Sequence, residues 1–160
     1  MIIGIVAVDQ NGAIGKGGKL PWHYSADMKF FKETTTGNAV VMGHNTWRSL
    51  KNPLPNRLNI VLSRHSEIEP QDSLLALPDV ESVLSTAKGL PTDLYVIGGE
   101  QVYRSFLPYI AKWIVTEVPL TISDADAFVP ENYLEGFELT DSKKIGEGLT
   151  VSFYHRDKLS

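Results

Sequence analysis

The sequence predicts an α/β fold in which parallel strands alternate with helices. Short apolar runs rich in β-branched residues predict buried strands over residues 2–8, 39–43, 58–63, 94–97 and 113–118. Helical stretches separate these runs, and strands that are joined through helices form parallel crossovers. Apolar and polar side chains alternate over residues 137–155, which predicts an antiparallel hairpin near the C-terminus.

Length and composition favour one compact domain over residues 1–160. Hydrophobic residues make up 42% of the chain, and there is no cysteine for a disulfide, a thiolate metal site or a cysteine nucleophile. The net charge is −4 and no basic run stands out, which argues against a nucleic-acid partner. No apolar stretch approaches the roughly 20 residues of a membrane span, and the N-terminal run lacks the features of a signal peptide. We therefore expect a cytoplasmic protein with no membrane partner.

Local signals set the ends of the predicted helices. Ser25 is expected to cap a helix that begins near residue 26. Residues 9–20 contain four glycines, which predicts a mobile loop before this helix. Further helices are expected over residues 45–50, 79–88 and 101–106, with Asp79 at the start of the second and Gly89 at its end.

Asp27 is the most informative candidate for proton chemistry. It lies in the first turn of its predicted helix and shares a face with Met28 and Phe31, because side chains three or four positions apart are neighbours on a helix. A carboxylate among apolar side chains is desolvated, which raises its pKa and suits it to hold a polar ligand or move a proton. The alternative is a helix cap, since acidic residues are favoured in the first turn. Helix spacing alone does not separate the two interpretations.

Two strand-to-helix turns are candidates for phosphate binding. Gly98 and Gly99 follow one strand and Gly43 ends another, so backbone N–H groups can approach a phosphate at either turn. After Gly43, His44 offers a weak cation and Thr46 a hydroxyl. A tight turn or an exposed loop without a ligand is the alternative. The full dinucleotide fingerprint, G-x-G-x-x-G, is absent from the sequence.

Other polar residues carry weaker signals. Ser63 and Arg64 end a strand with a hydroxyl and a guanidinium, which suits phosphate recognition, although a surface arginine without a ligand is the more common case. The four histidines lack metal-ligand spacing, so no metal site is expected.

Taken together and in order, these pieces resemble dihydrofolate reductases of the bacterial type. The resemblance runs from residue 2 to about residue 120 and weakens in the tail. Each motif is common alone, but the ordered set at family-like spacing is specific. The matching residues are Ala7-Val8-Asp9, Ile14-Gly15, Leu20-Pro21-Trp22, Asp27, Phe31-Lys32, Val41-Met42-Gly43, Thr46-Trp47, Leu54-Pro55, Arg57, Asn59-Ile60-Val61-Leu62-Ser63, and Ile97-Gly98-Gly99 with Val102-Tyr103.

The resemblance implies a mostly parallel, twisted central sheet with a C-terminal antiparallel strand and about four flanking helices. It implies NADPH-dependent reduction of 7,8-dihydrofolate to 5,6,7,8-tetrahydrofolate, with hydride transfer to C6 of the pterin and protonation of N5. It also implies a monomeric enzyme of one-carbon metabolism that binds antifolates of the trimethoprim and methotrexate class.

The same resemblance assigns catalytic residues. Asp27 would hydrogen-bond the 2-amino group and N3 of the pterin, and it would lie too far from N5 to protonate it directly. Trp22 and Thr116 would orient water around it. Leu20 would belong to the mobile loop that closes over the nicotinamide and excludes bulk water. Tyr103 would lie beside the nicotinamide.

Substrate and cofactor contacts follow in the same way. Arg57 would pair in a fork with the α-carboxylate of the glutamate tail, and Lys32 would lie at the rim. The substrate rings would be enclosed by Ile5, Met28, Phe31, Leu50 and Leu54. Cofactor contacts would come from Ala7, Ile14, Gly15, Gly43, His44, Asn45, Thr46, Leu62, Ser63, Arg64, Ile97, Gly98, Gly99, Glu100, Gln101, Val102 and Tyr103. A cis peptide is implied between Gly98 and Gly99.

The sequence departs from the family pattern at several places. His44 stands where the family usually has arginine beside the adenosine phosphate, so Arg64 is the other candidate for the 2′-phosphate, and we expect NADPH affinity to weaken as His44 loses its proton. The residues before the catalytic helix are Tyr24-Ser25 instead of the usual Leu-Pro.

A segment that normally braces the mobile loop also differs. Ala125-Asp126-Ala127 replaces the family's G-D-T, and Asp124 competes with Asp126 for the register. We therefore expect loop closure to differ from the family pattern.

Two other functions fit parts of the pattern. A related NADPH-dependent reductase of a riboflavin-pathway pyrimidine shares this architecture, but it does not require Trp22, Asp27 and Arg57 together. A non-catalytic nucleotide-binding module would bind NADPH without turnover. The four-glycine loop argues against that module, since a static binder has little use for a mobile lid.

Overall fold

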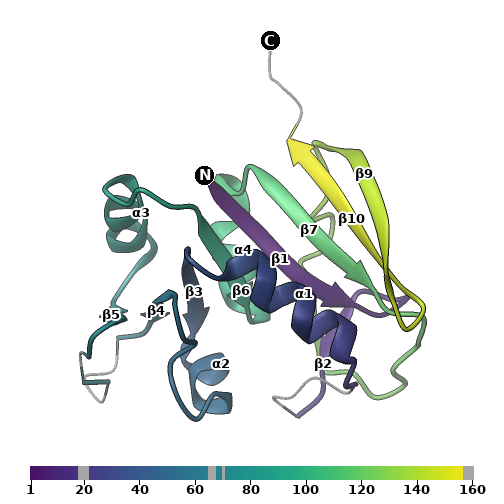
Figure 1. Cartoon of the computed structure of the whole chain (residues 1–160), viewed down its shortest axis with the longest axis horizontal. Coiled ribbons are helices and arrows are strands. Elements are labelled where there is room, and N and C mark those ends of the chain that lie inside the picture. The colour runs from purple at the N-terminus through teal and green to yellow at the C-terminus, as the bar shows by residue number, and fades with distance from the viewer. Residues whose placement is uncertain (18–21, 65–67, 70, 157–160) are drawn as a thin grey trace.

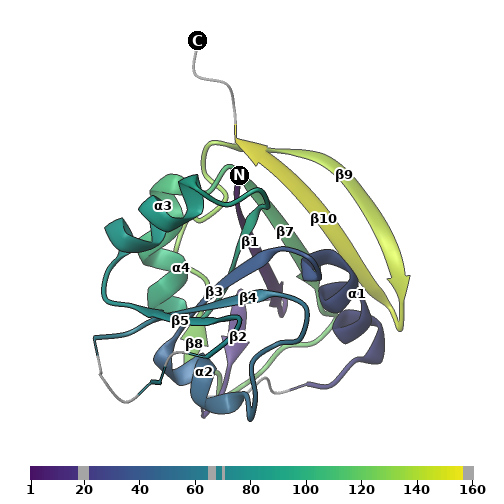
Figure 2. The ribbon, with the colours of Figure 1, turned by 60° about the vertical axis from the view of Figure 1, so that its left-hand side comes forward.

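The central feature is a twisted sheet of eight strands, shown from two sides in Figures 1 and 2. The computed structural model describes residues 1–17, 22–64, 68–69 and 71–156. In spatial order the strands are β5 (Leu74–Leu77), β4 (Leu58–Leu62), β3 (Ala39–Gly43), β6 (Leu94–Gly98), β1 (Ile2–Val8), β7 (Lys112–Glu117), β10 (Leu149–Arg156) and β9 (Phe137–Gly146).

The strand directions confirm the predicted architecture. β1 pairs in parallel with β6 and β7, and β3 pairs in parallel with β4 and β6. The C-terminal hairpin is antiparallel, both within itself and where β10 meets β7. The carboxyl ends of β1, β3, β4 and β6 therefore meet at one edge of the sheet, which is where ligands bind in open α/β sheets.

Helices cover both faces of the sheet, which explains the continuous apolar runs of its inner strands. Ile5 of β1 belongs to the buried cluster that contains Phe30, whereas Val6, its neighbour, belongs to the cluster that contains Phe106. Figure 2 shows the corresponding helices, α1 and α4, on opposite sides of β1. The helices are α1 (Ser25–Thr35), α2 (His44–Ser49), α3 (Val80–Lys88) and α4 (Glu100–Phe106), followed by a 3-10 turn, η1 (Leu107–Tyr109). None of the helices in the described part of the chain is long and apolar enough to cross a membrane.

The predicted starts of α3 and α1 are both met to within one residue, but the predicted cap of α1 is wrong. Asp79 caps α3 by accepting a hydrogen bond from the backbone N–H of Ser82 at 2.8 Å. Ser25 was expected to cap α1, but it is the first residue of that helix, and the N-cap residue Tyr24 makes no side-chain cap bond. The reason is tertiary, because the backbone N–H of Ala26 donates to the side chain of Glu147, far along the chain.

Short strands were missing from the sequence-based expectation. The predicted mobile loop contains β2 (Ala13–Gly15), which pairs with β8 (Ala127–Phe128) in a small separate sheet. β5 lies at the edge of the main sheet and was also missed. Two- to four-residue strands are too short for periodicity to reveal.

Candidate active site

Asp27 lies half-buried in the first turn of α1, where its side chain meets the end of β7. Its carboxylate lies close to the side chain of Thr116, which is itself buried in β7. Burial raises the pKa of Asp27, and the hydrogen bond from Thr116 lowers it by less, so the net pKa lies above the ordinary value. A carboxylate held across two elements in a partly desolvated site favours a functional role over a helix cap.

Trp22 and Ala7 pack in a small cluster that also includes Ala26, the residue before Asp27. Ala7 is paired with Thr116 in the β1–β7 register and packs against a small cluster that includes Trp22. The indole N–H of Trp22 is buried and has no hydrogen-bond partner among the described residues. Buried donors are nearly always paired, so this N–H can donate to a ligand or to a water that bridges to one.

Tyr103 connects the glycine turn to β1. Its hydroxyl donates to the backbone carbonyl of Ile5 at 2.7 Å, and its ring lies about 3.5 Å from where a side chain on Gly98 would begin. Burial, and then the charge of Asp27, raise the pKa of Tyr103 far above its ordinary value, so the hydroxyl stays protonated.

Arg57 is buried with its guanidinium fixed in place. Its Nε donates to the carbonyl of Pro55 at 2.9 Å, and its Nη1 donates to the hydroxyl of Thr35 at 3.0 Å. Its cation also lies 6.0 Å from the ring centroid of Phe31. These contacts use two of the five N–H groups of a guanidinium, so an outer carboxylate can be recognised by a preorganised fork.

The predicted apolar wall is assembled in part. Ile5 is buried, and Phe31, Leu50 and Leu54 pack against the same cluster. Two further side chains of α1 do not join it, since Met28 is 57% exposed and Lys32 is also exposed.

The turn before β4 is held by Asn59, which the sequence analysis gave no structural role. The side-chain amide of Asn59 accepts from Leu54 N at 2.8 Å and donates to Leu54 O at 2.9 Å.

The double-glycine turn has the predicted geometry. The peptide between Gly98 and Gly99 is cis, and Gly98 has a φ of 124° that favours glycine. A side chain built on Gly99 would first meet the hydroxyl of Thr46 at 3.9 Å, so the turn is open in front of its backbone. Gly43 serves packing instead, since its Cβ would lie 3.0 Å from Val102.

A cleft of about 580 Å³ opens beyond the carboxyl end of β4. It brings together four residues that were predicted to contact a cofactor: Leu62, Ser63, Arg64 and Gln101. Asp79, Glu81 and Ser105 also line it, and the sequence analysis missed them as site residues. Two hydrogen bonds from Ser82 lower the pKa of Asp79, and the nearby charge of Arg64 lowers it further. The cleft therefore offers cationic and anionic groups side by side.

The other predicted cofactor residues are spread along the same edge. His44 is the first residue of α2 and is followed by the exposed Asn45. Glu100 is directed elsewhere, because its carboxylate accepts a hydrogen bond from Phe128 N of β8 at 2.9 Å. Half-buried Ile14, buried Gly15 and half-buried Ile97 complete the set.

Asp9 is a buried anchor of the loop that follows β1, and the sequence analysis gave it no such role. Its carboxylate accepts from the backbone N–H groups of Asn11, Ala13 and Ile122, each at 2.8 Å. The sequence does contain a signal for this role. Asp9 stands between a buried strand and an Asn-Gly turn, a position that favours hydrogen bonds from nearby backbone N–H groups to the side chain.

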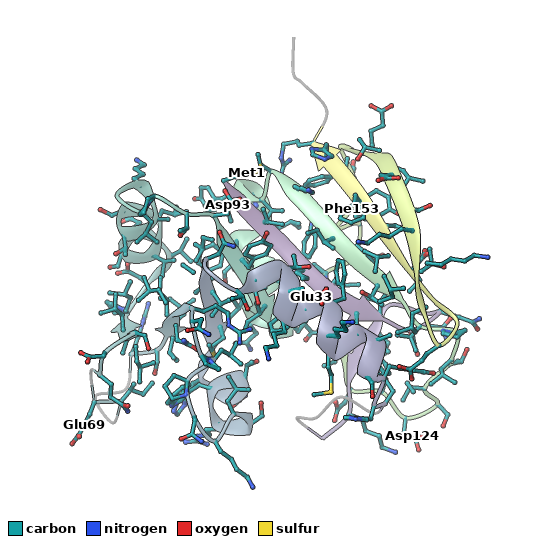
Figure 3. The ribbon with its side chains drawn as sticks, in the orientation of Figure 1. Met1, Glu33, Glu69, Asp93, Asp124 and Phe153 are labelled. Carbon is teal, nitrogen blue, oxygen red and sulfur yellow. The ribbon has the colours of Figure 1, made fainter. Side chains whose placement is uncertain are left out.

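Two aspartates after β7 also contact this loop. The sequence left open whether Asp124 or Asp126 would do so, and both of them do. Asp126 accepts from Gly17 N at 2.9 Å, and Asp124 forms an ion pair with Lys16 at 3.3 Å. Figure 3 shows Asp124 far from Met1 and Asp93, which form an ion pair at the opposite end of β1. Leu20 and Pro21 lie outside the described residues.

Comparison with known proteins identifies the family. A family model described as dihydrofolate reductase matches residues 1–156. The chain is 34% identical over 135 residues to the dihydrofolate reductase of Haemophilus influenzae, covering 84% of this chain and 82% of that protein. It is 35% identical over 144 residues to that of Bacillus subtilis, covering 90% and 84%. A solved dihydrofolate reductase from Enterococcus faecalis, complexed with NADP(H) and RAB-propyl, aligns with a TM-score of 0.89 at 32% identity, covering 99% of this chain and 97% of that one. The chain belongs to the dihydrofolate reductase family.

Proposed function

We propose that this chain catalyses the NADPH-dependent reduction of 7,8-dihydrofolate to 5,6,7,8-tetrahydrofolate. The observation that carries the proposal is the half-buried Asp27 next to Thr116, with the N–H of Trp22, which has no partner among the described residues, in the adjoining cluster. A carboxylate in such a site recognises a flat, polar ring through its N–H donors. Family membership supplies the identity of that ring.

Asp27 anchors the pterin and influences its protonation from a distance. The carboxylate accepts hydrogen bonds from the 2-amino group and N3, which fixes the ring in the site. Its negative charge favours a proton on the ring, and the partly desolvated surroundings strengthen that field. Thr116 holds the carboxylate, and Trp22 directs a water toward the ring, so the proton reaches N5 through water.

Arg57 holds the other end of the substrate. The Thr35 and Pro55 contacts fix the guanidinium plane before any ligand arrives, so little side-chain entropy is lost when the tail carboxylate binds. The benzoyl ring between the two ends packs on Phe31, Leu50 and Leu54.

The residues present fit a dinucleotide along the carboxyl edge. Gly99 leaves its backbone accessible beside the hydroxyl of Thr46, which suits a pyrophosphate. The cleft at Ser63 and Arg64 suits the adenosine end. Ala7, Ile14, Ile97 and Tyr103 would contact the nicotinamide, which when bound supplies a hydride to C6 of the pterin.

The proposal also covers domain organisation, oligomeric state and location in the cell. We propose one domain over residues 1–160, a monomeric state and a cytoplasmic location. The ordinary apolar fraction supports one domain and the lack of cysteine fits a reducing compartment, while the monomer is what the family resemblance implies. Size-exclusion chromatography with light scattering checks the monomer. Tight competition by methotrexate or trimethoprim checks the expected antifolate binding.

The decisive experiment is a spectrophotometric assay. The protein is mixed with NADPH and dihydrofolate, and oxidation of NADPH is followed at the nicotinamide absorbance band. We expect turnover that requires both compounds and is largely lost in Asp27→Asn. No oxidation by a folded protein would refute the proposal, and turnover only with a riboflavin-pathway pyrimidine would identify the related reductase instead.

A further inference from the structure

The first turn of α1 is capped from the other end of the sequence. The first hydrogen bond within this helix runs from Met28 N to the carbonyl of Tyr24, so the preceding N–H groups need partners from outside. Tyr24 supplies none through its side chain. Glu147 supplies one, because its Oε1 accepts from Ala26 N at 2.7 Å. The acceptor is a carboxylate at the positive end of the helix dipole, which strengthens the contact.

The backbone around Glu147 fits it to this position. Glu147 lies in the turn between β9 and β10, with a φ of 55° that non-glycine residues seldom adopt. Its neighbour Gly146 would bring a Cβ within 3.8 Å of Ala26, and Gly148 would bring one within 3.8 Å of Pro119. Both ribbon views show this turn beside the start of α1 (Figures 1 and 2). The turn therefore packs between the helix and the segment that follows β7.

The same hairpin also supports Thr116, which lies close to Asp27. Val151 of β10 is paired with Thr116 of β7, and Val151 is only a few residues beyond Glu147. The hairpin therefore makes two contacts. Its strand β10 pairs with β7 at Thr116, and its turn residue Glu147 caps the start of α1. The relative position of Asp27 and Thr116 depends on both contacts.

We propose that Glu147 is a positioning residue for the reaction, because it caps α1 from the hairpin turn and thereby sets where the carboxylate of Asp27 lies relative to Thr116. This inference rests on the proposed function for the role of Asp27. When Glu147 is truncated, the residues before Met28 fray and the anchor for the pterin loosens. The cofactor edge lies on other elements and stays intact.

The test compares two variants with a matched control. Glu147→Ala removes the acceptor but keeps the Cβ, so the backbone strain at this position is unchanged. Glu147→Gln keeps an acceptor oxygen at the same reach. Glu138→Ala removes an exposed glutamate near the opposite end of β9 and serves as the control. For each protein the KM values for dihydrofolate and NADPH are measured, together with hydrogen exchange of the backbone amides of Ala26 and Asp27.

We expect Glu147→Ala to raise the KM for dihydrofolate by about threefold to fivefold, which corresponds to the free energy of a lost helix cap. The KM for NADPH is expected to stay unchanged. The Ala26 amide of this variant exchanges faster, whereas Glu147→Gln and Glu138→Ala stay near the wild type. An unchanged KM for dihydrofolate with faster exchange would overturn the positioning role, and unchanged exchange would overturn the cap itself. If the wild type shows no turnover, the proposed function fails, while exchange at Ala26 still decides whether the cap exists.

Discussion

Replacing Asp9 with Asn tests how far the loop after β1 depends on one carboxylate. In the wild type, Oδ1 accepts from Asn11 N and Ala13 N, and Oδ2 accepts from Ile122 N. The Asn amide keeps one acceptor oxygen and places an NH₂ group where Oδ2 lies. At least one backbone N–H then faces a donor, and the other bonds lose the charge of the acceptor.

The expected cost follows from these bonds. An unsatisfied buried donor costs about 1–3 kcal/mol, and losing the charge assistance on the remaining bonds costs about 1 kcal/mol more. We therefore expect Asp9→Asn to lower the free energy of unfolding by about 2–4 kcal/mol at neutral pH. In urea, this corresponds to a midpoint lower by about 1–2 M.

The pH dependence gives a second readout. Burial alone raises the pKa of Asp9, but the backbone hydrogen bonds from Ile122, Ala13 and Asn11 together lower it below the ordinary value of 3.8. A carboxyl with a lowered folded pKa stabilises the protein fully above its unfolded pKa, and the contribution is lost as the pH falls through the folded pKa. The difference between wild type and variant is thus expected to shrink below about pH 4.

Urea unfolding followed by circular dichroism at neutral and acidic pH measures both effects. Asp72→Asn, at an exposed position, is the matched control and is expected to leave the midpoint unchanged. A variant midpoint equal to that of the wild type, or a difference that persists unchanged in acid, would refute the assignment of Asp9 as a charged anchor.

Three further predictions concern other sites. Asp27→Asn is expected to keep or raise stability at neutral pH by ~1 kcal/mol while removing most activity, because a raised pKa means that ionisation is disfavoured in the folded state. That gain is absent in acid below the unfolded pKa, and full activity in the variant would contradict the role of Asp27. Gly4→Ala is expected to lower the free energy of unfolding by about 3 kcal/mol, since its Cβ would overlap the ring of the fully buried Trp113. An unchanged melting temperature would show that the ring can move. His44→Ala is expected to weaken NADPH binding, measured by fluorescence titration, because His44 begins α2 at the cofactor edge, and unchanged affinity would exclude that contribution.

The main sheet was predictable because its strands are buried on both faces. Residues 2–8 and 39–43 read as continuous apolar runs, and alternate side chains serve the clusters above and below the sheet. The short strands β2 and β8 were not predictable in this way. Each is stabilised by pairing with the other across more than a hundred residues, and that pairing leaves no periodic signal in either segment.

The candidate site was predicted where residue type and order coincide with a family pattern. Asp27, Trp22 and Arg57 were identified by that resemblance, whereas helix spacing alone left Asp27 undecided between a ligand anchor and a cap. Asp79 shows the opposite case. It was correctly placed at the start of a helix, where the structure shows it as the cap, but its place in the cleft with Arg64 depends on how β4 and α3 pack.

The start of α1 shows most clearly why local reasoning fails. Ser25 has the right chemistry and the right place for a cap, yet the cap comes from Glu147. Glu147 belongs to the C-terminal hairpin, and it lies next to the helix only because β10 pairs with β7. The helix that carries Asp27 is thus held by a residue 121 positions away from Ala26 along the chain. Substrate affinity is therefore expected to depend on the hairpin turn as well as on the residues that line the site.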